Sequence, residues 1–561
     1  MQIAYQNLVQ PLVERAEAEP HFPSLVFVDT AGTGHTITAA ELHDNAARWA
    51  ALLQAHGVQP GRVVMINLSH SLSLFYSFLG AMYLGAIPTI YPSLLPNMSA
   101  AAYLAQLRGL AERADIATIV TTPDMAEMLP AGLGGLACDI IPVQDGGLDG
   151  LAPLLPDWPA IRPEQTAFLQ FSSGTTGLKK GVIITHGAVL RQTEAMTGRA
   201  GLTRGDVLVS WLPTHHDMGL VANVLVCFTA GIQLVKLSSI YWIRNPKSLL
   251  QAVSQYGGTH TYMPNFAFNH CVRGIREEDI RGVDLSSWRF ILNAAEPIRL
   301  DSITRFTEKF SPYGLPANAI HSAYGMAENT VAISFKNHAD PLYVDWVDQE
   351  RLQTTHQAVP SAPGAPGSLP IIGCGEAISG TELAIIDDAG QWLPDRHVGE
   401  IVLRGSSLFG GYFRQPELTA QAFLGDWFKT GDLGYLADGQ VFVTGRKKDL
   451  IIVGGKNIHP EDLEEIANEV PGVYEGRVVA FGLFSERLGT EQIVIVVETR
   501  RPVPEEDALA MATEIRRRVA HQTDVVVHDV RVLGRRWVQK SSSGKVARSA
   551  NRAQYVQEFL V

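Results

Sequence analysis

The fold of this chain is decided by one polar stretch, Ser172-Ser173-Gly174-Thr175-Thr176-Gly177-Leu178-Lys179-Lys180-Gly181. The apolar runs Phe168–Phe171 and Val182–Thr185 flank it and predict two strands joined by a loop. Glycines let successive backbone N–H groups face one point, hydroxyls add donors and lysine adds positive charge. The sequence therefore predicts a cradle for phosphate groups, formed by Ser173, Gly174, Thr175, Thr176, Gly177 and Lys180.

This loop differs from the phosphate loop of motor proteins and GTPases. The chain lacks the pattern G-x-x-x-x-G-K followed by Ser or Thr, and the loop leads into a strand rather than a helix. A polar hairpin loop without a ligand remains the alternative, because turns favour the same residues. The loop alone does not establish the function, so further motifs in the sequence are needed to identify it.

Composition narrows the class of protein. The 561 residues, 46% of them hydrophobic, are enough for two or three domains. A net charge of −12 argues against a nucleic-acid partner, which usually needs a clustered basic surface. Four scattered cysteines and an N-terminus without a signal pattern favour a cytoplasmic protein. The most apolar segment, 72–87, is shorter than the ~20 residues that a membrane span requires, so we expect a buried helix there.

Two patterns divide the chain. From Thr38 to about Pro264, helical patterns alternate with short apolar runs, which is typical of an α/β layered domain. After Gly445, a shorter series predicts a small α+β domain. We therefore expect an α/β fold with a large multi-subdomain N-terminal domain (1–445), a hinge (446–449) and a small mobile C-terminal domain (450–561). The stretch 344–370, rich in proline at its end, predicts an ordered but irregular insertion.

Five further motifs follow the loop in order. They are Asn293-Ala294-Ala295-Glu296-Pro297-Ile298, Tyr324-Gly325-Met326-Ala327-Glu328, Thr430-Gly431-Asp432, Gly445-Arg446-Lys447-Lys448-Asp449 and Ser542-Ser543-Gly544-Lys545. Together with the loop, they resemble the adenylate-forming superfamily of acyl-CoA synthetases, amino-acid adenylation domains and luciferases. The resemblance extends from Phe171 to Arg548, and so covers most of the chain.

The resemblance implies a binding site for ATP and AMP. Tyr324 can supply a stacking surface for the base, and Asp432 can accept hydrogen bonds from the ribose hydroxyls. Glu328 is a hard oxygen ligand of the kind that Mg²⁺ prefers, and Thr175 adds a hydroxyl near the same ion. Besides the loop, the implied nucleotide-binding residues are Ala294, Ala295, Glu296, Tyr324, Gly325, Met326, Asp432 and Arg446.

The implied reaction is attack by a substrate carboxylate on the α-phosphorus of ATP, which expels pyrophosphate and leaves an acyl-adenylate. Such a reaction needs positioning and charge neutralisation more than a protein nucleophile. The implied catalytic residues are Lys545, which approaches the carboxylate and the α-phosphate, Lys180, which holds pyrophosphate, and His216. Lys448 stands at the hinge position about which the family's C-terminal domain rotates between adenylation and thiol acylation.

One passage indicates a branch of the superfamily. Trp211-Leu212-Pro213-Thr214-His215-His216-Asp217-Met218-Gly219-Leu220 is similar to a segment of fatty acyl-AMP ligases that borders the acyl pocket, and Pro264-Asn265-Phe266-Ala267 is similar to another. The resemblance implies an acyl pocket formed by Trp211, His216, Asp217, Met218, Met263 and Phe266. In these ligases an insertion at the position of 344–370 accompanies loss of coenzyme A use. It implies transfer of the acyl group to the phosphopantetheine of a separate holo-acyl carrier protein.

Several alternatives remain open from the sequence. The insertion is also compatible with a tolerated surface loop on a fatty acyl-CoA synthetase. Asp217 stands in a region where amino-acid adenylation domains place an aspartate, so an amino-acid or β-amino-acid substrate is a further possibility. His215, His216 and Asp217 resemble a metal triplet, although adjacent ligands point apart on most backbones. A non-catalytic homologue that binds nucleotide or lipid is the alternative of another class.

Overall fold

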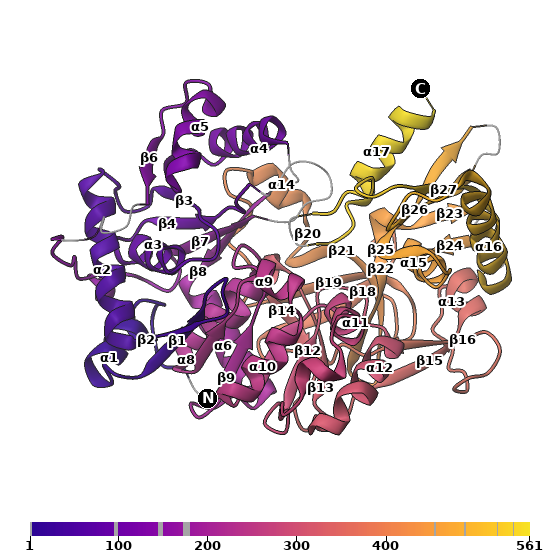
Figure 1. Cartoon of the computed structure of the whole chain (residues 1–561), viewed down its shortest axis with the longest axis horizontal. Helices are drawn as coiled ribbons and strands as arrows, with labels where there is room; N and C mark the ends of the chain where they lie inside the picture. Colours follow the sequence, from indigo (N-terminus) through magenta and orange to yellow (C-terminus); the bar gives the residue numbers. More distant parts are fainter. Residues whose placement is uncertain are drawn as a thin grey trace.

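The computed structural model describes residues 3–94, 99–143, 148, 150–171, 180–453, 456–486, 490–523, 525–541 and 544–560. Several twisted sheets with helices packed against them make up the N-terminal part, and a smaller group of strands and helices follows it (Figure 1). This arrangement confirms the expected α/β fold class. No helix in the described ranges is both long and apolar enough to cross a membrane.

The largest sheet has nine strands in the order β17-β14-β13-β12-β11-β9-β10-β1-β2. Its bounds are β1 Pro23–Val28, β2 Gly34–Thr38, β9 Val207–Ser210, β10 Gln233–Lys236, β11 His260–Met263, β12 Phe290–Asn293, β13 Ile320–Gly325, β14 Ala332–Phe335 and β17 Glu376–Ala377. The run from β1 to β13 is parallel, whereas β2, β14 and β17 pair antiparallel at the two ends. The carboxyl ends of the parallel strands therefore share one edge, where α/β sheets place their binding sites.

A second, four-stranded sheet is wholly parallel, in the order β4-β3-β5-β6. Its strands are β3 Val63–Asn67, β4 Ile87–Ile90, β5 Ile116–Thr121 and β6 Asp139–Pro142, and they alternate with helices α2 Ala39–Ala55, α3 Leu72–Tyr83, α4 Ala100–Arg113 and α5 Pro123–Leu133. Helix α3 begins where the hydroxyl of Ser71 accepts a hydrogen bond from the backbone of Leu74, and it is buried from Leu74 to Tyr83. The expected buried helix is confirmed.

The predicted strand pair around the polar loop is also present. Strand β7 (Thr166–Phe171) pairs antiparallel with β8 (Gly181–Thr185), and helix α6 (His186–Ala200) follows directly. The hydroxyl of Thr185 caps this helix by accepting from the backbone of Ala188 at 3.2 Å. The loop itself, Ser172 to Lys179, lies outside the described residues.

A third sheet presents two further motifs. Strands β18 Thr381–Ile386, β19 Gly399–Gly405, β21 Trp427–Ala437 and β20 Phe423–Leu424 lie in this order, and β22 Gln440–Arg446 pairs with β21. In the antiparallel register of β21 and β22, Asp432 lies opposite Arg446. The ribose motif and the first hinge residue are therefore neighbours across the sheet.

The insertion is more regular than predicted. It contains β15 (Val344–Asp348), helix α13 (Gln349–Thr355) and β16 (Ser368–Ile372), and the two strands pair antiparallel. Burial alternates along β15, where Asp345 and Val347 are buried between half-buried neighbours, as in a strand with one face covered. Most of the prolines fall between α13 and β16, and Pro370 is tolerated because this sheet has only two strands.

The C-terminal region has its own hydrophobic cluster. Its elements are β23 Ile451–Val453, β24 Lys456–Ile458, α15 Pro460–Asn468, β25 Val473–Ser485, β26 Thr490–Thr499, α16 Glu505–Thr523, β27 Val527–Leu533 and α17 Arg548–Phe559. Ile451, Leu463, Ile493, Ile515 and Val519 pack together in this cluster. The predicted α+β order is present, while the domain boundaries at 445 and 450 stay predictions.

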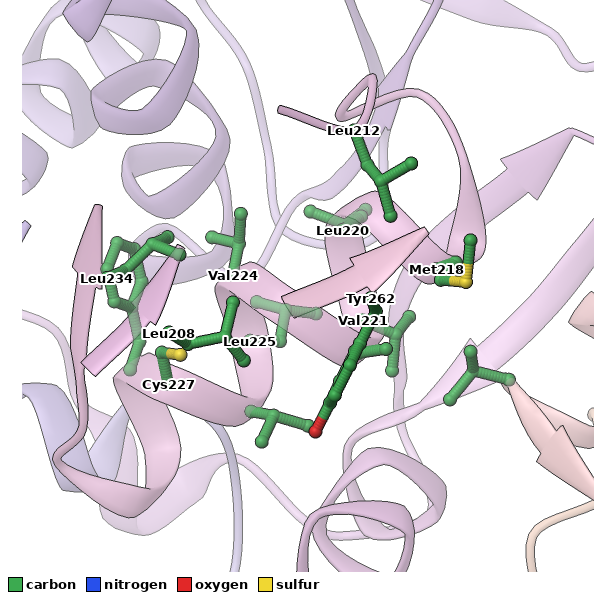
Figure 2. Packing of buried hydrophobic residues seen from close by; sticks show 14 of the residues in the cluster. Leu208, Leu212, Met218, Leu220, Val221, Val224, Leu225, Cys227, Leu234 and Tyr262 are labelled. Atoms are coloured by element: carbon green, nitrogen blue, oxygen red, sulfur yellow. The ribbon is translucent and has the colours of Figure 1, made fainter. Parts of the chain in front are cut away.

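The segment that follows His215, His216 and Asp217 is buried. Helix α7 (Asp217–Gly219) continues into a π-helical segment (Leu220–Leu225) and then α8 (Val226–Ala230). Figure 2 shows Leu220, Val221 and Val224 of this segment packed near Leu208 and Tyr262 of the nine-stranded sheet. Isolated π-helical turns occur frequently at functional sites, and this one fixes the segment that carries His216 and Asp217.

Candidate active site

One continuous cavity of about 3060 Å³ contains most of the predicted site. It lies between the carboxyl edge of the nine-stranded sheet and the C-terminal region. Among its lining residues are Lys180, His216, Glu328, Asp432 and Lys545, which are separated by hundreds of residues in sequence. The structure therefore brings together the catalytic, nucleotide-binding and metal candidates.

Tyr324, Asp432 and Arg446 form a bonded group. The Tyr324 hydroxyl donates to Oδ2 of Asp432 at 2.7 Å, and Arg446 Nε lies 3.2 Å from Oδ1 of the same carboxylate. Burial and the neighbouring Asp432 raise the pKa of Tyr324, so its hydroxyl remains a donor. The negative charge of Asp432 also makes the largest contribution to raising the pKa of Arg446. This group can present a ring, an acceptor and a positive charge to a nucleoside phosphate.

Glu328 is the residue suited to hold a magnesium ion. Its Oε1 accepts a hydrogen bond from Tyr412 Oη at 2.9 Å, and Lys180 Nζ lies 4.6 Å from the centre of the Tyr412 ring. Burial raises the pKa of Glu328, and a cation would offset that cost. The described residues contain no cluster of three or more His, Cys, Asp or Glu side chains that could hold a metal. Phosphates and water would thus supply the other ligands, as is common for Mg²⁺.

Lys545 reaches the cavity from a tight turn. Gly544 has a φ of +84°, and its N–H donates to the carbonyl of Ser541 at 2.9 Å, while Ser541 N–H donates to the Lys545 carbonyl at 2.7 Å. Glycine adopts this left-handed conformation without strain. Burial lowers the pKa of Lys545, as does Arg446, whereas Asp217, Glu296 and Asp432 oppose that shift. The ammonium group thus lies among carboxylates from both ends of the site.

His216 and Asp217 stand at the start of α7. Their nearest polar atoms, His216 Nδ1 and Asp217 Oδ1, are 3.9 Å apart, and Met218 N–H donates to Asp217 Oδ1 at 2.7 Å. Burial raises the pKa of Asp217, but the neighbouring His216 and then Lys545 outweigh it and lower the pKa. Asp217 is therefore an ionised partner for Lys545.

Aromatic side chains form the wall of the implied acyl pocket. The rings of Trp211 and Trp242 stack with centroids 3.6 Å apart, and the Phe266 ring packs edge-on at 5.9 Å from Trp211. Met218 also lines the cavity. Met263 is fully buried in β11, and the described lining of the cavity does not include it. The role of Met263 in the acyl pocket therefore stays a prediction.

The predicted adenine segment follows β12. Ala295, Glu296, Gly325 and Met326 line the cavity, whereas the buried Ala294 is not part of the described lining. Ala295 has a φ of +71°, which turns the chain toward Glu296. Glu296 Oε2 then accepts from the backbone N–H of Phe266 at 3.0 Å. A hydrogen bond therefore joins the predicted adenine segment to the predicted acyl pocket.

Some predicted residues cannot be placed. Ser173, Gly174, Thr175, Thr176 and Gly177 lie outside the described residues, as do Ser542 and Ser543. The phosphate cradle and the threonine contact to magnesium therefore stay predictions.

Ion pairs lie on each side of Lys448 in the segment predicted to be the hinge. Lys447 Nζ lies 3.0 Å from Glu400 Oε2 and 2.9 Å from Asp388 Oδ1, both in the N-terminal part. Asp449 Oδ2 lies 2.9 Å from Arg548, the first residue of α17. Burial lowers the pKa of Lys448 itself. Lys447 is therefore paired with the N-terminal part, whereas Asp449, two residues later, is paired with the C-terminal region.

Three functional contacts were missed by the sequence reasoning. Tyr412 holds Glu328, Gln170 Nε2 donates to the carbonyl of His215 at 2.7 Å, and Arg548 joins the hinge to α15 through Glu464 at 2.9 Å. Gln170, a polar residue in the apolar strand β7, gave a usable signal. Tyr412 and Arg548 gave none, because their partners are distant in sequence.

Ion pairs also hold the C-terminal region over the cavity. Arg299, immediately before helix α12 (Leu300–Phe310), lies 3.2 Å from Asp462 and 2.8 Å from Glu465 of α15. Arg273 of α11 (Asn265–Gly274) pairs with Glu475 of β25. These contacts stabilise the arrangement in which Lys545 points into the cavity.

The chain is similar to known proteins over nearly its whole length. The AMP-binding enzyme family model matches residues 12–413. A putative acyl-CoA synthetase of Caulobacter vibrioides (strain NA1000 / CB15N) is 31% identical over 95% of this chain and 96% of its own. The medium-chain-fatty-acid–[acyl-carrier-protein] ligase JamA of Moorena producens (strain JHB) is 33% identical over 72% of this chain and 70% of its own. A solved structure from work on fatty acyl-adenylate ligases of E. coli and L. pneumophila superposes with a TM-score of 0.91 at 27% identity, covering 99% of both chains.

Proposed function

Because this chain belongs to the AMP-binding enzyme family, we propose that it activates a fatty acid with ATP. The product of the first step is a fatty acyl-adenylate, released pyrophosphate being the second product. In the second step the acyl group passes to the phosphopantetheine thiol of a separate acyl carrier protein. The chain is then a fatty acyl-AMP ligase.

The observation that carries the proposal is the position of Lys545. Its ammonium group interacts with Asp217 at the acyl end of the cavity and with Asp432 at the nucleotide end. A carboxylate oxygen that attacks the α-phosphorus must pass between these two ends. Lys545 thus stands where negative charge accumulates, and stabilisation of such charge is commonly the largest catalytic contribution of an enzyme.

The other residues position the two reactants. Tyr324 and Asp432 are suited to hold the nucleoside, and Lys180 is suited to neutralise the leaving pyrophosphate. Glu328 and Thr175 would hold Mg²⁺, which supplies charge neutralisation at the phosphates when bound. The chemistry is then a displacement at phosphorus: the new carboxylate oxygen–phosphorus bond forms, and the bond to the pyrophosphate oxygen breaks.

The acyl substrate follows from the other end of the cavity. Trp211, Met218 and Phe266 offer an apolar wall beside His216, and both JamA and the fatty acyl-adenylate ligases are named for fatty acids. JamA is named for transfer to an acyl carrier protein, and this chain carries the β15–α13–β16 insertion that we associate with that acceptor. The Caulobacter relative is named for coenzyme A, so the acceptor is the part to test.

Two assays test the proposal. ATP–pyrophosphate exchange is measured with fatty acids and, separately, with amino acids; exchange driven only by amino acids would overturn the substrate class. Fatty acid and ATP are then mixed with either coenzyme A or a holo-carrier protein, and acyl-AMP, acyl-CoA and acyl-carrier are quantified. We expect acyl-carrier to form and acyl-CoA to be negligible. Rapid formation of acyl-CoA would make the protein an acyl-CoA synthetase.

A further inference from the structure

Lys236 is a buried cation at the carboxyl end of β10. Only 1% of its surface is exposed, and its Nζ donates to the backbone carbonyl of Leu212. In the described part of the chain, no carboxylate forms an ion pair with it, and burial lowers its pKa to about 7. A buried ammonium group without a counter-charge is costly, so its presence requires an explanation.

Lys236 faces the same cavity as the proposed reaction centre. The lining includes His216, Trp211 and Lys236, and also the polar residues Thr30, Ser69 and His70. Lys236 is the register partner of Phe27 on the neighbouring strand β1, and the His70 ring stacks on Phe27 with centroids 4.3 Å apart. His70 and Lys236 are therefore neighbours in the lining of one cavity.

The charges around Lys236 and His70 favour an anionic group. Burial and the charge of Lys236 lower the pKa of His70 to about 4, so His70 is neutral at physiological pH. An unbranched hydrocarbon terminus would leave the ammonium group unpaired, and a hydroxyl would leave its charge uncompensated. A carboxylate would supply both the counter-charge and a charge-assisted hydrogen bond.

We propose that Lys236 forms a subsite for a second carboxylate, at the end of the acyl chain opposite to the one that is activated. This inference rests on the proposed function, and it assigns the substrate class as α,ω-dicarboxylic acids. One carboxylate reacts with ATP beside Lys545, and the other stays ionised beside Lys236.

Lys236 also supports the loop that carries His216, and the test must separate this role. That loop has other anchors: Leu237 N–H donates to the Ser210 carbonyl at 2.8 Å, and Ser239 Oγ donates to the Trp211 carbonyl at 2.6 Å. Loss of the lysine alone therefore leaves the loop attached. The measured quantity is a selectivity ratio, which a general weakening of the loop would not change.

The experiment compares each α,ω-dicarboxylic acid in a length series with the monocarboxylic acid of the same length, by ATP–pyrophosphate exchange. We expect the natural protein to have a higher kcat/KM for the diacid at one or more lengths. In Lys236→Met, the ratio of diacid to monoacid kcat/KM should fall by about tenfold or more, the value of a lost charge-assisted hydrogen bond.

Lys309→Met is the matched control. Lys309 also donates to backbone carbonyls, those of Val272 and Ile275, and burial also lowers its pKa, but the described lining of the cavity does not include it. In this variant, the ratio of diacid to monoacid kcat/KM should equal that of the natural protein.

The possible negative results distinguish the subsite from the proposed function. An equal loss for diacid and monoacid in Lys236→Met, or a preference of the natural protein for ω-hydroxy or monocarboxylic acids at every length, would overturn the subsite. The proposed function would still stand in those cases. Exchange with neither acid class would instead contradict the proposed function itself.

Discussion

Tyr324 and Asp432, which are 108 residues apart in sequence, are joined by a hydrogen bond of 2.7 Å. The same carboxylate faces Arg446 across the antiparallel register of β21 and β22. The ring, the acceptor and the first hinge residue are therefore one bonded unit. Removal of the central carboxylate should affect all of its members.

Asp432→Ala should raise the KM for ATP by about tenfold or more, because it removes hydrogen bonds made by a charged group and leaves Arg446 without this partner. Tyr324→Phe, which keeps the ring and loses the hydroxyl, should have a smaller effect. The ATP dependence of pyrophosphate exchange measures both. An equal KM for Asp432→Ala and the natural protein would show that Asp432 does not bind the nucleotide.

Lys545→Ala should slow adenylation by roughly a hundredfold or more, since it removes a positive charge from the point where charge develops. ATP binding should change little, because Tyr324 and Asp432 remain. Single-turnover formation of acyl-AMP and ATP titration measure the two effects. Lys247→Ala, which removes a lysine paired with Asp279 away from the cavity, is the control. Adenylation at the natural rate in Lys545→Ala would contradict the assignment.

Lys448→Pro should spare acyl-adenylate formation and depress acyl transfer to the thiol, because proline fixes φ at the proposed pivot. Lys448→Ala removes the same side chain but leaves the backbone free to rotate, so it should retain more transfer. Separate assays of acyl-AMP and acyl-carrier formation show the difference. Undiminished thiol acylation in the proline variant would count against the hinge.

Shortening the insertion should increase the use of coenzyme A. Asp348 and Ser368 are register partners in β15 and β16, so residues 349–367 can be replaced by a two-residue Asn-Gly turn. This change removes α13, which packs against β24 of the C-terminal region. Acyl-CoA formation is measured with pyrophosphate exchange as the control for folding. If exchange persists and acyl-CoA formation does not rise, the insertion does not exclude coenzyme A.

The buried Lys236 should make stability rise with pH. Its pKa is about 7 in the folded protein, against an ordinary 10.5, so between these values the unfolded chain binds more protons. Stability contributed by this group is lowest below pH 7 and increases toward pH 10.5. From pH 7 to pH 9, the natural protein should gain about 2 kcal/mol relative to Lys236→Met, measured by chemical denaturation. Parallel pH profiles of the two proteins would contradict the buried charge.

The sequence predicted the fold where local patterns are strong. The antiparallel strands that flank the polar loop, the buried helix α3 and the order of elements after Gly445 were all identified, because period and turn residues are local properties. The insertion was less predictable. Its prolines are concentrated after α13, and they concealed the short strand pair on either side.

Only those residues of the candidate site that belong to sequence motifs could be predicted. Tyr324, Glu328, Asp432 and Lys545 meet in one cavity, as the ordered motifs indicated. Tyr412 could not be found, because an isolated tyrosine has no pattern that points to a carboxylate 84 residues away. The burial of Lys236 could not be predicted either, because a lysine at the end of an apolar strand is usually exposed to solvent.

The ion pairs around the proposed hinge have a mechanical consequence. Lys447 is tied to Glu400 and Asp388, while Asp449 is tied through Arg548 to the helix that follows the Lys545 turn. Rotation about the backbone torsions of Lys448 would leave both sets of ion pairs intact. We infer that the Lys545 turn, α15 and Asp449 move as one rigid body, and that such a swing would break the ion pairs of Arg299 and Arg273 and the packing of α13 on β24. The free energy that holds the protein in the proposed adenylating state would then depend on these contacts between the two parts of the chain as well as on the site residues themselves.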